Sequence, residues 1–172
     1  MQAAWSGKRR DFMKTILVLS DSHGDIENMK LAVQKTEPDL IIHLGDCWND
    51  AGYLKREFPD IIMERVPGNC DYVSEQEERI LTIEGKKFLI CHGHTYSVKL
   101  SMLNIELGAK EKEADVVLFG HTHRLFYDYH NGLAFLNPGS IGSPPRGVPA
   151  SYGVILIDEE TGKFDMDIEY IE

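Results

Sequence analysis

The chain has 172 residues, of which 42% are apolar, and its formal net charge at pH 7 is −10. This length and this apolar content are typical of a single folded domain with a buried core. Broad binding to phosphate backbones or to anionic lipid needs clustered cations, so the acidic balance argues against duplex nucleic acid as a partner. No apolar stretch approaches the roughly 20 residues that span a bilayer, so no membrane association is expected.

The first residues differ from the rest of the chain. Residues 1–10 show no helix or strand pattern, whereas Met13 leads directly into the apolar run 15–19. We therefore expect residues 1–12 to be a disordered leader or remnant and residues 13–172 to form one domain. The leader lacks the apolar centre of a secretory signal, which favours a cytoplasmic location.

Strands and helices alternate in the first part of the chain. The predicted strands are continuously apolar, which is typical of a parallel sheet covered by helices. Asp25 precedes the first helical pattern as a capping residue, and Pro38 ends it. The expected order is strand 16–19, helix 26–36, strand 40–42, helix 49–57 and strand 61–66.

From Glu78 onward the pattern favours strands. A hairpin is expected first, and a helix over 98–113 is expected to carry Leu100, Leu103 and Leu107 on its apolar side. The fold class is therefore α/β, and two sheets packed face to face with helices outside is the most consistent architecture. The expected strands are 79–83, 87–90, 116–119, 125–129, 133–136, 153–157 and 164–171.

Short polar segments follow the apolar runs at five places. Strand ends of this kind meet at one edge of a parallel sheet, where ligands of such sheets bind. The segments supply seven oxygen and nitrogen donors of the kind that hold divalent cations. These donors are Asp21, His23, Asp46, Asn69, His92, His121 and His123.

The spacing within the segments favours a centre with two cations. Side chains two positions apart point to the same face of an extended segment, so Asp21 can converge with His23, and His121 with His123. Asp46 is the candidate bridging carboxylate, and Gly45 before it permits a close turn. Two cations about 3.5–4 Å apart lower the pKa of a shared water and clamp a phosphoryl group.

Each short motif also has an ordinary structural interpretation. A single Asp after a strand often serves only as a cap, whereas two histidines on one face have little packing role. His43 and His130 stand alone and are interpreted as core or surface residues. His94 shares a face with His92, which leaves it as a phosphate contact, a proton donor or a residue that supports a ligand.

These residues in this order resemble the calcineurin-like metallophosphoesterase superfamily, in particular its small YfcE-like phosphodiesterase branch. The resemblance covers residues 14–171 and implies a four-layer α/β/β/α sandwich of two mixed sheets. It implies one metal held by Asp21, His23, Asp46 and His123, a second held by Asp46, Asn69, His92 and His121, and a bridging hydroxide that attacks phosphorus. Asp46, Asn69 and His94 are the expected catalytic residues, and Asn69, His94 and Arg146 the expected substrate contacts.

The segment 137–140 also matches this branch and is expected to shape the substrate mouth. Cys70 departs from the superfamily, in which histidine often follows the metal-binding Asn and serves as an acid or phosphate donor. Three cysteines, an odd number, give no disulfide framework. Cys47, Cys70 and Cys91 each adjoin an expected ligand. They could be soft metal ligands or sites of oxidation, but the preferred interpretation is that they are small residues packed in the core.

The leading functional hypothesis is hydrolysis of small or accessible phosphodiesters with two divalent cations. Mn²⁺ is expected first, and Fe²⁺, Zn²⁺ and Ni²⁺ also suit this donor set. The alternatives are a protein-binding scaffold like the retromer subunit that resembles this fold, a phosphomonoesterase, or a nuclease. The partners expected are a small phosphodiester substrate and, in a homo-oligomer, further copies of the chain.

Overall fold

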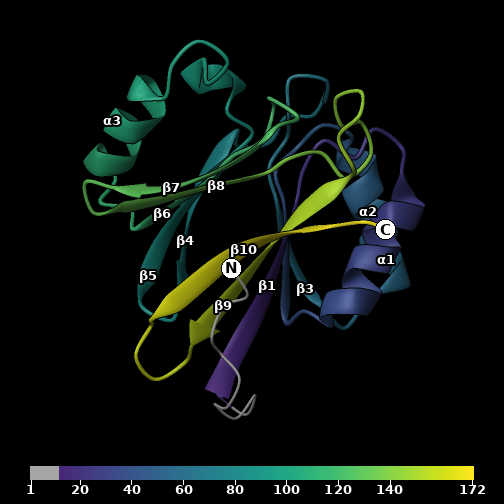
Figure 1. Ribbon diagram of the computed structural model, residues 1–172, viewed down its shortest axis with the longest axis horizontal. Coiled ribbons are helices and arrows are strands. Elements are labelled where there is room, and N and C mark those ends of the chain that lie inside the picture. The colour runs from purple at the N-terminus through teal and green to yellow at the C-terminus, as the bar shows by residue number, and fades with distance from the viewer. Residues whose placement is uncertain (1–11) are drawn as a thin grey trace.

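The computed structural model describes residues 12–172, and the expected leader lies outside the described residues except for Phe12. In the described part, two five-stranded sheets pack face to face, with α1 and α2 outside one sheet and α3 outside the other (Figure 1). The expected four-layer α/β/β/α sandwich of two mixed sheets is therefore confirmed. No helix of the described residues is long and apolar enough to cross a membrane.

The first sheet has the strand order β10-β9-β1-β2-β3. Strand β1 pairs in parallel with β2, and β2 in parallel with β3, while β9 is antiparallel to both β1 and β10. The bounds are β1 (Met13–Leu19), α1 (Ile26–Thr36), β2 (Leu40–His43), α2 (Trp48–Glu57), β3 (Ile62–Arg65), β9 (Ser151–Asp158) and β10 (Phe164–Tyr170).

The second sheet has the strand order β4-β5-β6-β8-β7. Strands β4 and β5 form the expected hairpin, β5, β6 and β8 are parallel, and β7 is antiparallel to β8. The bounds are β4 (Glu78–Ile83), β5 (Lys86–Cys91), the 3₁₀-helix η2 (His94–Tyr96), α3 (Leu103–Glu111), β6 (Val116–Leu118), β7 (Leu125–His130) and β8 (Leu133–Pro138).

The central strands are apolar without interruption because both of their faces are buried. Ile16 and Val18 of β1 pack into the core between the two sheets, whereas Leu17 and Leu19 pack under α1 and α2. Asp25 caps α1 as expected, because its Oδ1 accepts a hydrogen bond from the N–H of Asn28 at 3.0 Å. The polar segments after these strands are thereby held at one edge of the sandwich.

The helix expected over 98–113 is shorter than its pattern, and its apolar side was assigned wrongly. Helix α3 begins at Leu103, where the Ser101 hydroxyl accepts a hydrogen bond from the Leu103 N–H. Leu100, Leu103 and Leu107 are exposed, and the buried side is formed by Ile105 and Ala109. The chain before α3 turns instead of continuing the helix, because Ser97 adopts a left-handed backbone with φ 55°.

Candidate metal centre

The seven expected ligands follow five different strands and meet at one edge of the molecule. Asp21 and His23 follow β1, Asp46 follows β2, and Asn69 follows β3. His92 follows β5, whereas His121 and His123 follow β6. Contacts between side chains join all seven residues into one cluster: Asp21, His23, Asp46, Asn69, His92, His121 and His123.

The Asp21 carboxylate lies at the centre of this cluster and is fully buried. Its Oδ2 accepts hydrogen bonds from the Ser20 hydroxyl at 2.6 Å and from the His121 N–H at 3.1 Å. Its Oδ1 has no hydrogen-bond partner among the described residues. Instead, this oxygen faces imidazole nitrogens, with Nε2 of His123 at 3.2 Å and Nε2 of His92 at 3.8 Å.

Backbone carbonyls determine which nitrogen of each histidine faces the centre. Nδ1 of His92 lies 2.7 Å from the Leu44 carbonyl oxygen, and Nδ1 of His123 lies 2.7 Å from the Ser143 carbonyl oxygen. Because a carbonyl oxygen only accepts hydrogen bonds, each Nδ1 carries the hydrogen, and each Nε2 of a neutral ring presents a lone pair. Lone pairs of Asp21 and of these histidines therefore face one another, an arrangement that a cation or added protons must compensate.

Further acceptors surround the same space. Nε2 of His92 lies 3.1 Å from Oδ1 of Asn69 and 3.4 Å from Oδ1 of Asp46. Nε2 of His23 lies 3.5 Å from Oδ2 of Asp46, so the two oxygens of Asp46 face two different histidines. One group has its candidate ligand atoms within 4.8 Å of one another: Asp21, His23, Asp46 and His123. This donor set fits a divalent cation.

The histidine rings fall into two groups on either side of the carboxylates. The rings of His23 and His123 have centroids 5.1 Å apart. On the other side, the ring of His121 lies 5.1 Å from that of His92 and 6.1 Å from that of His94. His23 and His123 thus lie on one side of the carboxylates, and His92 and His121 on the other.

Charge and burial set the protonation of these groups. Burial alone raises the pKa of Asp21, but the imidazole of His123, 3.2 Å from its Oδ1, the nearby ring of His92 and the Ser20 hydroxyl outweigh burial and hold this pKa below its usual value. Attraction to the same carboxylate raises the pKa of His123. Burial, followed by repulsion from His92 and Lys99, lowers the pKa of His121 to about 4. His121 is therefore neutral near pH 7 and offers a lone pair to a cation.

The local backbone differs from the extended segments that the spacing predicted. Asp21, His23, His121 and His123 all have positive φ angles, of 54°, 44°, 70° and 57°. The side chains two positions apart do converge, but left-handed turns bring them together. Non-glycine residues in this region are strained by about 1–3 kcal/mol each, and such strain gathers at functional sites.

Gly45 allows the close turn that its position predicts. Its φ is +100°, and a Cβ atom there would lie 2.5 Å from the backbone nitrogen of Gly68. A Cβ atom on Gly68 would in turn lie 2.1 Å from Oδ1 of Asp46. The two glycines therefore let the turn that carries Asp46 pack directly against the turn that carries Asn69.

A buried network supports the turn that carries Asp21 and His23. The Gly45 N–H donates to Nδ1 of His43 at 3.3 Å, so Nε2 of His43 carries the hydrogen and donates to the Ser22 hydroxyl at 3.1 Å. This hydroxyl donates to Oδ2 of Asp50 at 2.8 Å. His43 was expected to be a core or surface residue, and it is a fully buried one. His43 carries its hydrogen on Nε2, whereas His92 carries it on Nδ1, and both ring nitrogens of His43 are engaged in hydrogen bonds.

Acid is expected to weaken the fold through His43. Burial lowers the pKa of His43 from 6.5 to about 4. Between these values the unfolded chain binds a proton that the folded chain does not, so stability falls as the pH falls from 6.5 toward 4. The loss from this residue amounts to roughly 3 kcal/mol at its full extent. Chemical denaturation at pH 7 and pH 5 should show about 2 kcal/mol of this loss, and His43→Gln should remove that part of the pH dependence while the surface variant His130→Gln keeps it.

Two residues of the segment 137–140 support the site from below and do not face the substrate mouth. Asn137 and Ser140 are fully buried. Nδ2 of Asn137 donates to the Gly120 carbonyl oxygen at 2.9 Å and to the Thr122 hydroxyl at 3.0 Å. The Ser140 hydroxyl donates to the Asp21 carbonyl oxygen at 2.8 Å. This segment therefore holds in place the turn that carries Asp21 and the turn that carries His121 and His123.

Asp71 is a supporting residue to which the sequence analysis gave no role. Its Oδ2 accepts hydrogen bonds from the N–H groups of Asp46 at 3.0 Å and Gly68 at 2.8 Å. Its Oδ1 accepts from the Trp48 N–H at 2.7 Å. The carboxylate thus ties the Asp46 turn to the Asn69 turn. Its place two residues after Asn69, in a turn, was the available signal, since Asp commonly caps backbone N–H groups there.

The expected substrate residues lie in different surroundings. His94 lies beside His92 and His121, and its Nδ1 is buried without a hydrogen-bond partner among the described residues. Arg146 is exposed and forms no ion pair with the part of the chain that the structure describes. The structure therefore places His94 at the cluster, and the role of Arg146 stays a prediction.

The cysteines differ from the preferred interpretation as core residues. Cys91 is buried in the core under α3, as expected. Cys70 is exposed and Cys47 is half-buried, so core packing is wrong for Cys70. Both lie in the turns that hold Asp46 and Asn69, where the strand ends leave the core. All three thiols are free.

Metal binding is expected to stabilise the fold, because it neutralises the lone pairs that face one another. At a concentration of Mn²⁺ one hundred times the dissociation constant, the unfolding free energy should rise by about 2.7 kcal/mol. Thermal unfolding with Mn²⁺ and with a chelator measures this gain. His123→Ala should reduce it, whereas His130→Ala should not, since His130 pairs with Asp128 and Glu106 away from the cluster. An equal gain in both variants would place the metal elsewhere.

Comparison with known proteins identifies the family of this chain. A family model described as the calcineurin-like phosphoesterase superfamily domain matches residues 13–160. The probable metallophosphoesterase YsnB of Bacillus subtilis is 34% identical over 148 residues, covering 84% of this chain and 85% of YsnB. Phosphodiesterase YfcE of Escherichia coli is 28% identical over 172 residues, covering 83% of this chain and 88% of YfcE.

Solved structures share the fold. A conserved uncharacterized protein of Streptococcus pneumoniae superposes with a TM-score of 0.77 at 27% identity, covering 92% of this chain and 90% of that one. Vacuolar protein sorting 29 of Cryptosporidium parvum superposes with a TM-score of 0.72 at 18% identity, covering 94% of this chain and 99% of that one, which shows the fold alone. The match of the family model and of YsnB over most of the chain agrees with the resemblance seen in its strand-end residues, and the chain belongs to the calcineurin-like phosphoesterase superfamily.

Proposed function

We propose that this chain is a phosphodiesterase that hydrolyses small or accessible phosphodiesters at a centre holding two divalent cations. The observation that supports this most is the buried Oδ1 of Asp21, which faces the Nε2 atoms of His123 and His92 and accepts no hydrogen bond from the described residues. The similarity to YfcE, which is named a phosphodiesterase, supports the same reaction class.

The cluster offers a ligand set for each cation. Asp46 is the proposed shared ligand, because its Oδ2 faces His23 at 3.5 Å and its Oδ1 faces His92 at 3.4 Å. The remaining ligands divide as the ring groups do. The first set would be Asp21, His23, Asp46 and His123, and the second Asp46, Asn69, His92 and His121.

Two divalent cations, with Mn²⁺ expected before Fe²⁺, Zn²⁺ or Ni²⁺, would lower the pKa of a shared water and neutralise charge on a phosphoryl group. The protein's own part is to hold donors in place: carbonyls fix the rings of His92 and His123, and Asn69 adds an uncharged oxygen. His94, which lies beside His92 and His121, is proposed to contact a bound phosphoryl group, and Arg146 is proposed to do so from its loop.

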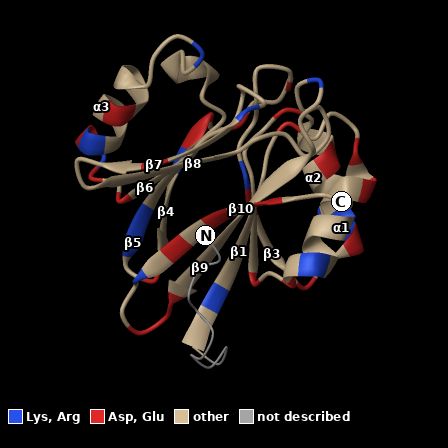
Figure 2. Ribbon diagram, in the orientation of Figure 1, with Lys and Arg blue, Asp and Glu red and all other residues tan. Residues whose placement is uncertain are grey.

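The other functions fit less well. A protein-binding scaffold would share the fold, but protein contact alone does not require seven clustered donors around an unpaired buried carboxylate oxygen. A nuclease acting on duplexes needs a basic surface. In the described part of the chain, Lys and Arg are interspersed with Asp and Glu over the helices and strands (Figure 2). A cytoplasmic location and homo-oligomer formation stay predictions.

Metal content and activity together test the proposed function. The purified protein should bind about two Mn²⁺ per chain, the number that a shared-carboxylate centre holds. Protein stripped by a chelator should not hydrolyse bis(p-nitrophenyl) phosphate, and added Mn²⁺ should restore the reaction. Hydrolysis of p-nitrophenyl phosphate under the same conditions measures the preference for diesters over monoesters. A protein that is loaded with metal but hydrolyses neither compound would be a scaffold.

A further inference from the structure

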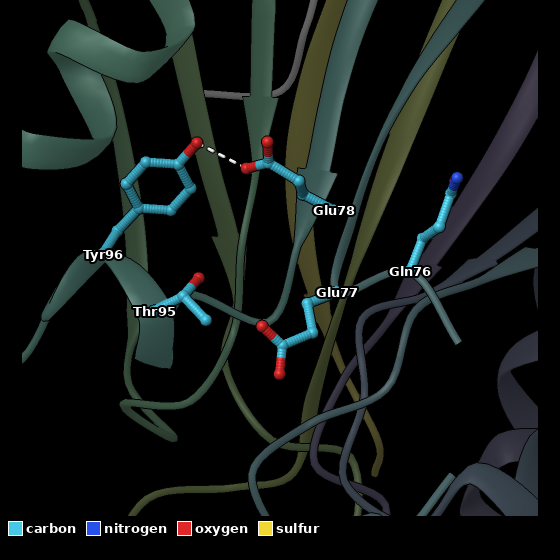
Figure 3. Close-up of a pocket in the computed structure, with 5 residues that line it drawn as sticks. All are labelled: Gln76, Glu77, Glu78, Thr95 and Tyr96. Carbon is cyan, nitrogen blue, oxygen red and sulfur yellow. Dashed lines mark hydrogen bonds between the residues drawn. The ribbon is translucent and has the colours of Figure 1, made fainter. Parts of the chain in front are cut away.

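An open hollow lies beside the proposed metal centre, on the side of His94. Its volume is about 520 Å³, and it is lined by Gln76, Glu77, Glu78, Thr95 and Tyr96. Figure 3 shows Thr95 and Tyr96 on one side of it and the segment that leads into β4 on the other. Its volume lies in the range of sites that bind small organic groups, and its side chains offer hydrogen-bonding groups that could orient one.

His94 joins this hollow to the centre. It directly precedes Thr95 in η2, and its ring lies 6.1 Å from that of His121. On the other side, its Nε2 lies 3.7 Å from Oε1 of Glu77, which lines the hollow. A phosphodiester bound at the centre would therefore extend one of its two ester arms past His94 toward Glu77.

The two carboxylates of the hollow differ in their partners. Glu78 is compensated, because its Oε2 accepts a hydrogen bond from the Tyr96 hydroxyl and its Oε1 lies 3.2 Å from Nζ of Lys112. This hydrogen bond, drawn as a dashed line in Figure 3, links the two sides of the hollow. Glu77 has no Lys or Arg partner among the described residues, and its side chain is 58% exposed. Glu77 therefore gives the hollow a negative charge that no Lys or Arg of the described residues neutralises, with the imidazole of His94 3.7 Å away.

Gln76 and Thr95 add neutral hydrogen-bonding groups to the lining, and none of the lining residues is a cation. A negative group on the substrate arm would be repelled by Glu77, whereas an ammonium or a hydroxyl group would be attracted or hydrogen-bonded. We propose that this hollow is a specificity subsite that binds the alcohol arm of the substrate. This proposal rests on the proposed phosphodiesterase function. The arm it selects donates hydrogen bonds and carries no negative charge, as in an amino alcohol or a polyol.

Three phosphodiesters with a common p-nitrophenyl group test the subsite. Their second arms are 3-aminopropyl, 3-hydroxypropyl and 2-carboxyethyl, which differ in charge but little in length. With the Mn²⁺-loaded protein, kcat/KM should decrease in that order, by about tenfold from the first to the last, the size expected for one partly exposed charge. The preference should shrink at high salt, because salt screens an exposed charge.

Variants of Glu77 connect the preference to the hollow. Glu77→Gln should reduce the ratio between the aminopropyl and carboxyethyl compounds to about twofold, and Glu77→Lys should reverse it. Glu57→Gln is the matched control: it removes one exposed carboxylate on α2, where Glu57 pairs with Lys30, and should keep the wild-type ratio. Methylphosphonate esters of the same three alcohols, which keep the arm and lack the leaving group, should show the same order of dissociation constants by calorimetry.

The outcomes separate the subsite from the function. Equal kcat/KM values for the three compounds, or a preference that Glu77→Lys leaves unchanged, would overturn the subsite while the phosphodiesterase function stands. Failure of the Mn²⁺-loaded protein to hydrolyse these compounds and bis(p-nitrophenyl) phosphate would overturn both. A charge order that follows Glu77 in both kinetics and phosphonate binding supports the subsite.

Discussion

Replacing Asp46 with Asn should lower kcat/KM for bis(p-nitrophenyl) phosphate by about 10³-fold or more, because one charged group is removed from both proposed cation positions. The substitution keeps the shape of the side chain and its Oδ1, which accepts the Cys70 N–H at 3.0 Å. Metal content, measured on the same preparation, should fall with activity. Asp46→Ala should abolish the reaction.

The stability of the metal-free Asp46→Asn protein should change in the opposite direction to its activity. Asp21 and Asp46 are both buried, and one oxygen of each faces Nε2 of His92, at 3.8 and 3.4 Å. Removing one of two neighbouring buried charges should raise the unfolding free energy by about 1 kcal/mol, as expected where function is favoured over stability.

Asp50→Asn is the matched control for the predicted gain in stability of Asp46→Asn. Asp50 is also buried, but its Oδ2 accepts hydrogen bonds from the Ser22 hydroxyl at 2.8 Å and the Gly24 N–H at 2.7 Å. Asp50→Asn should therefore lower the stability of the metal-free protein, because two hydrogen bonds to a charged carboxylate oxygen are replaced by weaker hydrogen bonds to a neutral amide. A loss of stability in Asp46→Asn as large as that in Asp50→Asn, with activity retained, would make Asp46 a structural residue.

The convergence of the candidate ligands could be predicted from the sequence because it follows from topology. Parallel strands end at a common edge of their sheet, which brings Asp21, Asp46 and Asn69 together in the first sheet and His92, His121 and His123 together in the second. Packing of the two sheets face to face then brings the two groups to one edge of the sandwich. The same logic located α1, whose cap at Asp25 and apolar spacing are local features. These signals need no knowledge of what packs against them.

The local geometry of the site depends on contacts between distant segments, and the sequence pattern did not contain it. The left-handed turn at Asp21 and His23 is held by Ser140 and by Asp50, which are 119 and 28 residues away from the Asp21 and Ser22 groups they bind. The prediction that Leu100 belongs to a helix was wrong for a related reason. An apolar pattern shows which residues would share a helix face, but the turn at Ser97 determines that the helix begins only at Leu103.

Asp71 received no role from the sequence, yet its replacement is expected to have a large effect on both stability and activity. Replacing it with Ala should leave the N–H groups of Asp46, Trp48 and Gly68 without their acceptor. At about 1 kcal/mol for each hydrogen bond lost, the unfolding free energy should fall by about 3 kcal/mol. The turns that carry Asp46 and Asn69 would no longer be tied together, and a displacement of about 1 Å between them would lower kcat by about 10²-fold.

The kinetic pattern separates this positioning role from a loss of folded protein. The assay uses saturating Mn²⁺, no denaturant and a temperature well below the unfolding transition. Under these conditions kcat of Asp71→Ala should stay low, because excess metal occupies the site but does not restore the spacing of its ligands. Asp39→Ala is the matched control: Oδ2 of Asp39 accepts the Thr15 N–H at 2.8 Å before β2, at the opposite end of that strand from Asp46. Asp39→Ala should lose stability and keep the wild-type kcat. If kcat fell equally in the two variants, the loss would follow from weaker folding, and the hydrogen bonds of Asp71 would have no separate role in aligning Asp46 with Asn69.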